Sequence, residues 1–148
     1  MPEAIKMIYQ GGSAEVIEKK SRFIGEIYSI GSEEEAQNIV NQIRKKHYDA
    51  RHHCFAYVLG EKNEVERCSD DGEPSGTAGR PMLDLLVGAG VHDALAVVTR
   101  YFGGTLLGTG GLVRAYSAAT KEALENCEIR QKEVGYRMTI ATDYRWKM

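Results

Sequence analysis

The amino-acid sequence predicts an α+β domain in which a mixed sheet is covered on one face by two main helices. Three observations lead to this prediction. Strand-like and helix-like segments follow one another without the regular alternation of a doubly wound parallel sheet. Residues 32–46 and 112–124 repeat apolar side chains at helical spacing. The length of 148 residues suits one compact domain.

The composition is that of a folded protein outside the membrane. The chain has 19 basic and 21 acidic residues, and 43% of its residues are hydrophobic. The resulting charge of −2 excludes a uniformly basic nucleic-acid coat but allows a local basic patch. The sequence has no apolar run of about 20 residues, and its start lacks the apolar core of a secretory signal. The scattered Cys54, Cys68 and Cys127 indicate reduced thiols, so we expect a cytoplasmic protein.

The first half of the chain predicts three strands, a helix and a further strand pair. Residues 5–9, 16–17 and 22–30 are expected as strands, with a break at 11–12, because they are rich in β-branched and aromatic side chains. Ser32 begins a helix, since Glu35 follows at the spacing of a capping box. Its buried stripe comprises Ala36, Ile39, Val40 and Ile43. Residues 53–59 are apolar on both faces, as an interior strand requires, and 65–68 pair back through a turn at 60–63.

The second half predicts a short helix, a buried strand, a longer helix and a last strand. Pro81 suits the first turn of a helix, which continues through 82–87 and ends at Gly88 or Gly90. Residues 92–102 carry the strongest buried-strand signature of the chain. The helix at 112–124 places five residues on its buried face: Leu112, Ala115, Tyr116, Ala119 and Ala123. One more strand is expected after residue 127.

A first glycine-rich segment, SDDGEPSGTAGRP at 69–81, is too polar for a core element. Its three acids, Asp70, Asp71 and Glu73, are oxygen ligands of the kind that divalent cations prefer, although their spacing does not match a calcium-binding loop. Turn and cap chemistry is a second interpretation, because Asp and Ser bond to nearby backbone groups. Contact with a ligand is a third, because the amides of 75–79 precede a helix and form an intrinsic anion site.

A second glycine-rich segment, RYFGGTLLGTGG at 100–111, joins the buried strand to the longer helix. Backbone amides in this setting cradle phosphates. The segment is not a nucleotide-hydrolysing P-loop, because Thr109 stands where that motif needs lysine. It also fails the dinucleotide pattern, because Val113 replaces the third glycine or alanine. Two interpretations stay open: a tight turn that needs glycine, and close approach by another molecule.

Arginines flank both segments, and their planar donors match phosphate geometry. Aromatic residues beside them, Tyr101, Phe102 and Tyr116, are suited either to the core or to stacking on bases. The candidate ligand-binding residues are therefore Arg22, Arg51, Asp70, Asp71, Glu73, Ser75, Gly76, Thr77, Gly79, Arg80, Arg100, Tyr101, Gly103, Gly104, Gly108, Thr109, Gly110, Gly111 and Arg114. A bound anion such as phosphate or sulfate would suit this set.

No catalytic residue, metal ligand or cofactor is assigned from the sequence. Neighbours along a strand point to opposite faces, so His53 and Cys54 cannot form a nucleophile–base pair. His52 shares a face with Cys54, but a packed thiol is the simpler interpretation of that cysteine. Cys54, Cys68 and the nearby histidines do not have zinc-ligand spacing.

The two glycine-rich segments, together with KKSRFIGEI and ARHHCFAYVLG, closely resemble the YigZ/IMPACT family from about Val16 to Leu124. The resemblance implies the fold of the second domain of ribosomal protein S-five, related to domain IV of translocation factors. It also implies an amino-terminal domain at 1–133, followed at 134–148 by a linker and the truncated start of a ferredoxin-like carboxy-terminal domain. Eukaryotic relatives carry a further amino-terminal partner-binding domain and restrain activation of an initiation-factor kinase, whereas the activity of bacterial members is unsettled.

Three functions follow from these observations. The preferred one is a non-enzymatic binding protein that regulates translation and recognises RNA or a ribosome-associated partner through phosphate contacts. The second is an enzyme on a small phosphorylated or nucleotide substrate, with the three acids as metal or acid–base groups. The third is a protein–protein regulatory scaffold, in which the glycines serve the fold alone.

Overall fold

The computed structural model describes residues 3–134 and contains two sheets and three helices within them. The larger sheet has the strand order β2-β3-β7-β4-β5, and all of its neighbouring pairs are antiparallel. Its strands are β2 (Ser13–Glu18), β3 (Ser21–Ser29), β4 (His52–Leu59), β5 (Val65–Ser69) and β7 (Ala94–Tyr101). The α+β prediction is confirmed.

The smaller sheet has the order β6-β1-β8 and is mixed, because β1 pairs parallel to β6 and antiparallel to β8. Its strands are β1 (Glu3–Gln10), β6 (Val91–His92) and β8 (Glu128–Val134). The sequence predicted one strand over 92–102, but Asp93 adopts a left-handed φ of 53° and separates β6 from β7. A single buried segment therefore serves both sheets.

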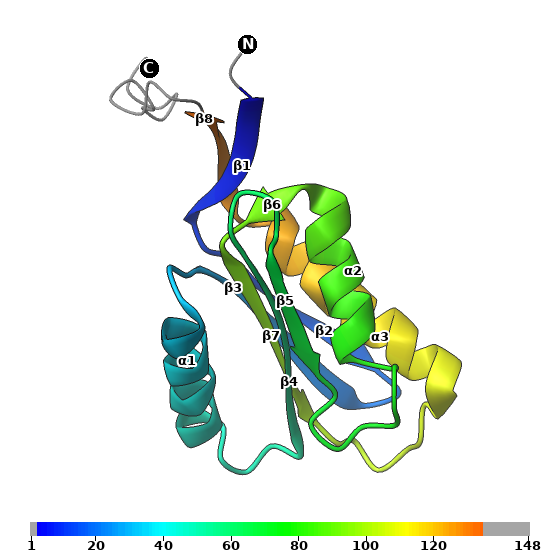
Figure 1. Ribbon diagram of the computed structural model, residues 1–148. Helices are drawn as coiled ribbons and strands as arrows, with labels where there is room; N and C mark the ends of the chain where they lie inside the picture. The colour runs from blue at the N-terminus through cyan, green and yellow to red at the C-terminus, as the bar shows by residue number, and fades with distance from the viewer. Residues whose placement is uncertain (1–2, 135–148) are drawn as a thin grey trace.

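The helices are α1 (Glu33–Lys46), α2 (Gly79–Ala89) and α3 (Gly108–Glu125), and they lie on both faces of the larger sheet (Figure 1). Side chains of α2 and α3 pack in one hydrophobic core with Cys54, Ala56 and Val58 of β4. Side chains of α1 pack in a second core with Leu95 and Val97 of β7. The expectation that the two longest helices share a face is wrong, because β4 and β7 are apolar on both faces and each face needs a cover.

The predicted capping box of α1 is present. The Glu35 amide donates to Ser32 Oγ at 3.0 Å, and the Gly31 amide donates to Glu35 Oε1 at 2.6 Å. At the carboxy-terminal end of α2, Gly90 has a left-handed φ of 73°, as expected of a glycine that ends a helix. The α3 helix begins four residues earlier than predicted, so Gly108 to Gly111 form its first turn.

The three predicted free thiols are confirmed as free cysteines. Within residues 3–134, none of the helices is long and apolar enough to cross a membrane. The expected linker and carboxy-terminal start at 134–148 lie, apart from Val134, outside the described residues.

Candidate functional site

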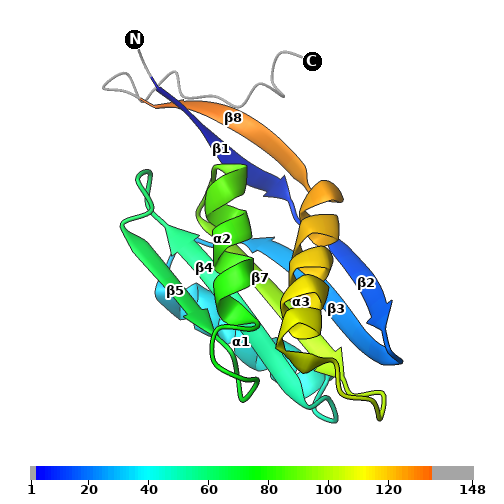
Figure 2. The same ribbon diagram turned by 90° about the vertical axis from the view of Figure 1, so that its right-hand side faces the viewer.

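The two glycine-rich segments lie at the same end of the larger sheet, the end away from β1 and β8 (Figure 1). The first connects β5 to α2, and the second connects β7 to α3. Because α2 and α3 run side by side over the sheet, both begin at this end (Figure 2). The fold thus brings together two segments that are separated by about twenty residues of helix and strand.

A buried ion pair joins the two segments directly. Both carboxylate oxygens of Glu73 accept from Arg100 Nη1, at 3.0 and 2.8 Å, and the Tyr116 hydroxyl donates to Glu73 Oε2 at 2.5 Å. The side chains of Arg100 and Glu73 are 6% and 3% exposed. An arginine so placed is not available to an external phosphate, because its departure would leave the buried carboxylate with only the Tyr116 hydroxyl and, at 3.6 Å, His52 Nε2 beside it.

Ser21 extends this network to the β2–β3 hairpin. Its Oγ accepts from Arg100 Nε at 3.4 Å, from Nη2 at 3.3 Å and from the Gly103 amide at 3.1 Å. Gly103 must be glycine for a steric reason, since a Cβ there would lie 2.1 Å from the carbonyl carbon of Lys20. Glycine at this position therefore serves the fold, which is one of the two interpretations left open by the sequence.

Asp70 occupies the amides that the sequence offered as an anion site. Its carboxylate accepts from the amides of Gly76, Ala78 and Gly79 at 2.9–3.1 Å. Burial opposes ionisation, but these three hydrogen bonds outweigh it and hold the pKa of Asp70 below its usual value. Turn and cap chemistry thus accounts for Asp70. The Thr77 amide donates to the carbonyl oxygen of Pro74 at 3.1 Å, so four of the amides at 75–79 are not free for a ligand.

Asp71 is also bonded within the protein, and it links the first glycine-rich segment to α1. Its carboxylate accepts from Arg44 at 3.3–3.4 Å and from the amide of His53 at 2.7 Å. Residues 3–134 hold no group of three or more His, Cys, Asp or Glu side chains that could bind a metal ion. The three acids of the first segment are each bonded within the protein, to different partners.

Cys54 lies on the α2–α3 face of β4, and its Sγ donates to the carbonyl oxygen of Asp70 at 3.1 Å. Burial raises the pKa of this thiol. His53 lies on the opposite face and bonds through Nε2 to the carbonyl oxygen of His47 at 2.8 Å. The interpretation of Cys54 as a packed thiol is confirmed.

The start of α3 keeps the features of an anion site. Leu107 at the N-cap position supplies no side-chain hydrogen bond, and the first turn contains no acidic residue. The first four amides of a helix have no intrahelical acceptor. The guanidinium of Arg114 reaches back over this turn, because a Cβ on Gly110 would lie 3.4 Å from its Nη1. Amide donors and a guanidinium therefore converge at Gly108–Gly111.

The other candidate arginines are exposed and lie at different places. Arg22 pairs with Glu15 at 2.8 Å and lies 5.2 Å from the ring centre of Tyr101. Arg51 lies over the ring of Phe102 at 4.5 Å and, among the described residues, forms no ion pair. Arg80 pairs with Asp84 at 3.1 Å on the surface of α2. Only Arg114 lies directly at the first turn of α3.

Sequence reasoning missed three residues at this end of the molecule. Ser21 gave no signal, because its partners are far away in the chain. Tyr48, between α1 and β4, and Leu106, before α3, are each 82% exposed. The signal available for Tyr48 and Leu106 was a large apolar side chain within a polar loop segment.

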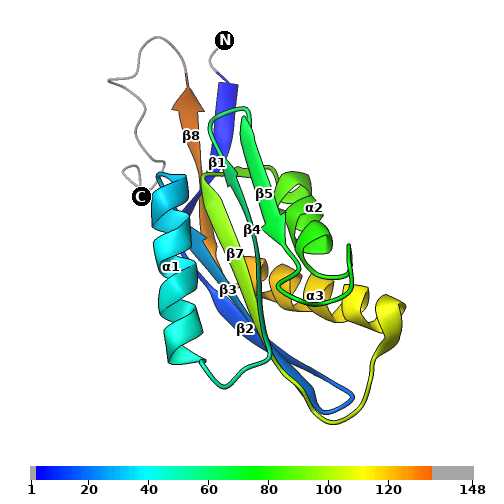
Figure 3. The same ribbon diagram turned by 60° about the horizontal axis from the view of Figure 1, so that its bottom comes forward.

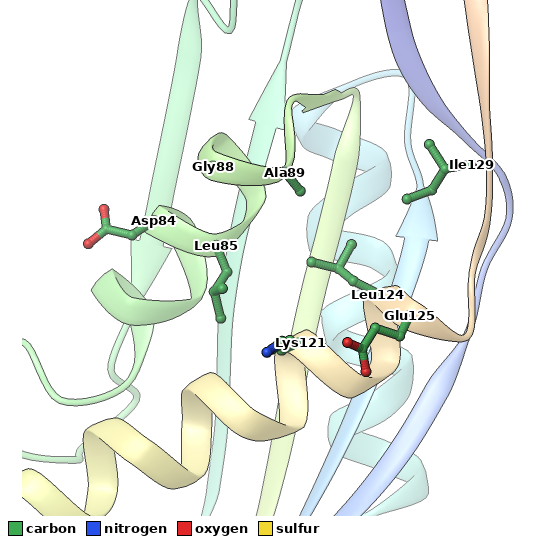
Figure 4. Close-up of a pocket in the computed structure, with 8 residues that line it drawn as sticks. All are labelled: Asp84, Leu85, Gly88, Ala89, Lys121, Leu124, Glu125 and Ile129. Atoms are coloured by element: carbon green, nitrogen blue, oxygen red, sulfur yellow. The ribbon is translucent and has the colours of Figure 1, made fainter.

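A separate groove lies between α2, α3 and β8, away from the glycine-rich segments (Figure 4). It has a volume of about 550 Å³ and is lined by Asp84, Leu85, Gly88, Ala89, Lys121, Leu124, Glu125 and Ile129. The lining is mostly apolar, and none of the sequence-predicted site residues contributes to it. The two surfaces are therefore distinct.

Comparison with known proteins supports the resemblance found in the sequence. The family model described as "Impact N-terminal domain" matches residues 19–124. The chain is 43% identical over 139 residues to the IMPACT family member YvyE of Bacillus subtilis, and the match covers 94% of this chain and 64% of YvyE. It is 46% identical to the IMPACT family member YigZ of Escherichia coli, covering 85% and 63%. The chain thus spans somewhat under two thirds of these relatives.

Two solved structures share the fold. One is a crystal structure described as that of a hypothetical protein, with a TM-score of 0.84 and 42% identity over 90% of this chain and 66% of the other. The other is the two-domain translational regulator Yih1, with a TM-score of 0.54 and 24% identity over 80% of this chain and 47% of Yih1. The second likeness bears on the fold alone.

Proposed function

This chain belongs to the IMPACT family, and we propose that it is a cytoplasmic, non-enzymatic RNA-binding protein that regulates translation. Support comes from the match to the Impact N-terminal domain and from the structural neighbour Yih1, which is described as a translational regulator. Because the chain spans only part of its curated relatives, the activity of the whole protein is included in this proposal.

The observation that carries the proposal is the first turn of α3. Its free amides, the positive end of an 18-residue helix dipole and the Arg114 guanidinium act on one spot. An RNA phosphate oxygen matches these donors in charge and geometry. The exposed Arg51 adds a second cation at the same end of the sheet, and Tyr48 offers an aromatic face on which a base can stack.

The structure favours this function over an enzyme that uses the three acids. Asp70 accepts hydrogen bonds from backbone amides, and Asp71 accepts from Arg44. Glu73 accepts from Arg100 and Tyr116. Recruiting any of them for metal binding or proton transfer would break bonds that hold the loop. The phosphate contacts are therefore assigned to α3 and not to the first glycine-rich segment.

The test is a salt titration of RNA binding by fluorescence anisotropy, with labelled single-stranded RNA and with tRNA. Log K should fall with log[salt] by about 0.7 per neutralised phosphate. Arg114→Gln should lower the slope by about this amount, whereas Lys121→Gln, a matched loss of charge on the far part of α3, should leave it unchanged. No measurable binding of the wild-type protein at low salt to RNA, tRNA or ribosomes would refute the proposal.

A further inference from the structure

The β2–β3 hairpin turn contains two lysines in an unfavourable backbone conformation. Glu18 pairs with Ser21, so Lys19 and Lys20 alone form the turn. Their φ angles are 45° and 70°, both in the left-handed region. A two-residue turn with both φ angles positive strongly prefers Asn-Gly, because glycine has no Cβ and asparagine tolerates this region. The turn therefore carries residues that its backbone geometry does not favour.

The lysine turn is also held rigidly against the second glycine-rich segment. Gly103 lies so close that a Cβ there would be 2.2 Å from the carbonyl oxygen of Lys20. The next residue, Ser21, is fully buried and bonds to the Gly103 amide and to Arg100. The network that joins the two glycine-rich segments thus also fixes the position of this turn. Figure 3 shows the end of the β2–β3 hairpin beside the segment that connects β7 to α3.

Both lysines are exposed, and no ion pair among residues 3–134 involves either of them. Of the acids on β2, Glu15 pairs with Arg22, and no ion pair among the described residues joins Glu18 to either lysine. Two consecutive exposed lysines therefore extend from a turn whose backbone is fixed, at the end of the sheet where α3 begins.

We propose that Lys19 and Lys20 form a second phosphate-binding element, which contacts the RNA backbone next to the phosphate at α3. The inference rests on the proposed function and adds residues that the glycine-rich segments do not contain. Backbone strain that persists at an exposed turn indicates a role outside folding, and the chemistry of two unpaired lysines is attraction to a polyanion. These contacts read no base, so binding through them is independent of sequence.

The test compares Lys19→Asn/Lys20→Gly with wild type in two assays, thermal unfolding and RNA binding. Relief of the strained turn should raise Tm by about 2–5 °C. Loss of two phosphate contacts should reduce the salt slope by about 1.4 and weaken binding about 25-fold near 0.1 M salt. Lys62→Gln/Lys121→Gln removes the same charge elsewhere and should bind as wild type does. Lys19→Arg/Lys20→Arg should retain the affinity.

The outcomes separate this inference from the proposed function. If the wild type binds RNA and Lys19→Asn/Lys20→Gly binds equally well, the lysine element is refuted and the α3 site stands. If the Lys62→Gln/Lys121→Gln control loses as much affinity, net charge and not the turn controls binding, which also refutes it. If the turn variant loses stability, the argument from strain is wrong. Absence of RNA binding by the wild type would remove the proposed function itself.

Discussion

Removal of Arg100 should destabilise the protein far more than removal of an exposed arginine. In Arg100→Met, the carboxylate of Glu73 stays buried with its side chain 3% exposed, and it loses both bonds from the guanidinium. Breaking one partner of a buried ion pair costs about 3–5 kcal/mol.

We therefore expect a loss of about 3–4 kcal/mol in the free energy of unfolding. This corresponds to a fall in Tm of roughly 10 °C for a chain of this size. Urea denaturation at constant m-value gives the free energy directly. The matched control is Arg80→Met, which removes an exposed partner of Asp84 and should cost at most about 0.5 kcal/mol.

A second variant tests whether the cost arises from the unpaired charge. Glu73→Gln/Arg100→Met removes both charges and keeps a carbonyl oxygen for the Tyr116 hydroxyl, so it should be more stable than Arg100→Met by about 1–2 kcal/mol. The reasoning is refuted if Arg100→Met and Arg80→Met lose similar stability, or if the double variant is less stable than the single one.

Two further predictions concern the loop and the glycines. Asp70→Asn should lower the free energy of unfolding at neutral pH. Hydrogen bonds lower the pKa of Asp70 in the folded state, so the stability that its carboxylate contributes is complete above about pH 4 and is lost as the pH falls through the lowered pKa. Plots of Tm against pH for the variant and the wild type should therefore converge in acid, and parallel plots would contradict this. Gly103→Ala should unfold at a lower temperature than the wild type, because the added Cβ would collide with the backbone of Lys20. In Gly88→Ala, within α2, the added Cβ meets no atom within 4 Å, so this variant should be more stable than the wild type by about 0.5–1 kcal/mol. Equal effects of the two substitutions on Tm would contradict the steric argument.

Several local features were predictable because their determinants lie within a few residues. The capping box at Ser32 and Glu35 depends on a spacing of three residues, and the structure contains both of its hydrogen bonds. The buried face of α3, from Leu112 to Ala123, follows from helical periodicity and is confirmed residue by residue. The opposite orientations of His53 and Cys54 follow from the alternation of side chains along a strand.

The candidate site was predictable only in part. The sequence identified the two glycine-rich segments, and the fold brings them to one end of the sheet. It did not reveal that Asp70 accepts from the amides of Gly76, Ala78 and Gly79, that Arg100 is buried against Glu73, or that α3 begins at Gly108. An acid or an arginine in a polar segment looks the same in sequence whether it meets a ligand or another part of its own chain.

The sequence by itself determined the class of the fold, most of its elements and the family, because these depend on local hydrogen bonding, periodicity and motif spacing. Only the tertiary structure decided which charges are used internally and which are left for a partner. The decisive contacts join distant residues: Arg100 meets Glu73 across 27 positions and Ser21 across 79. Such pairings are set when α2 and α3 pack on one face of the sheet that contains the β2–β3 hairpin, and burial then makes each unpaired charge costly.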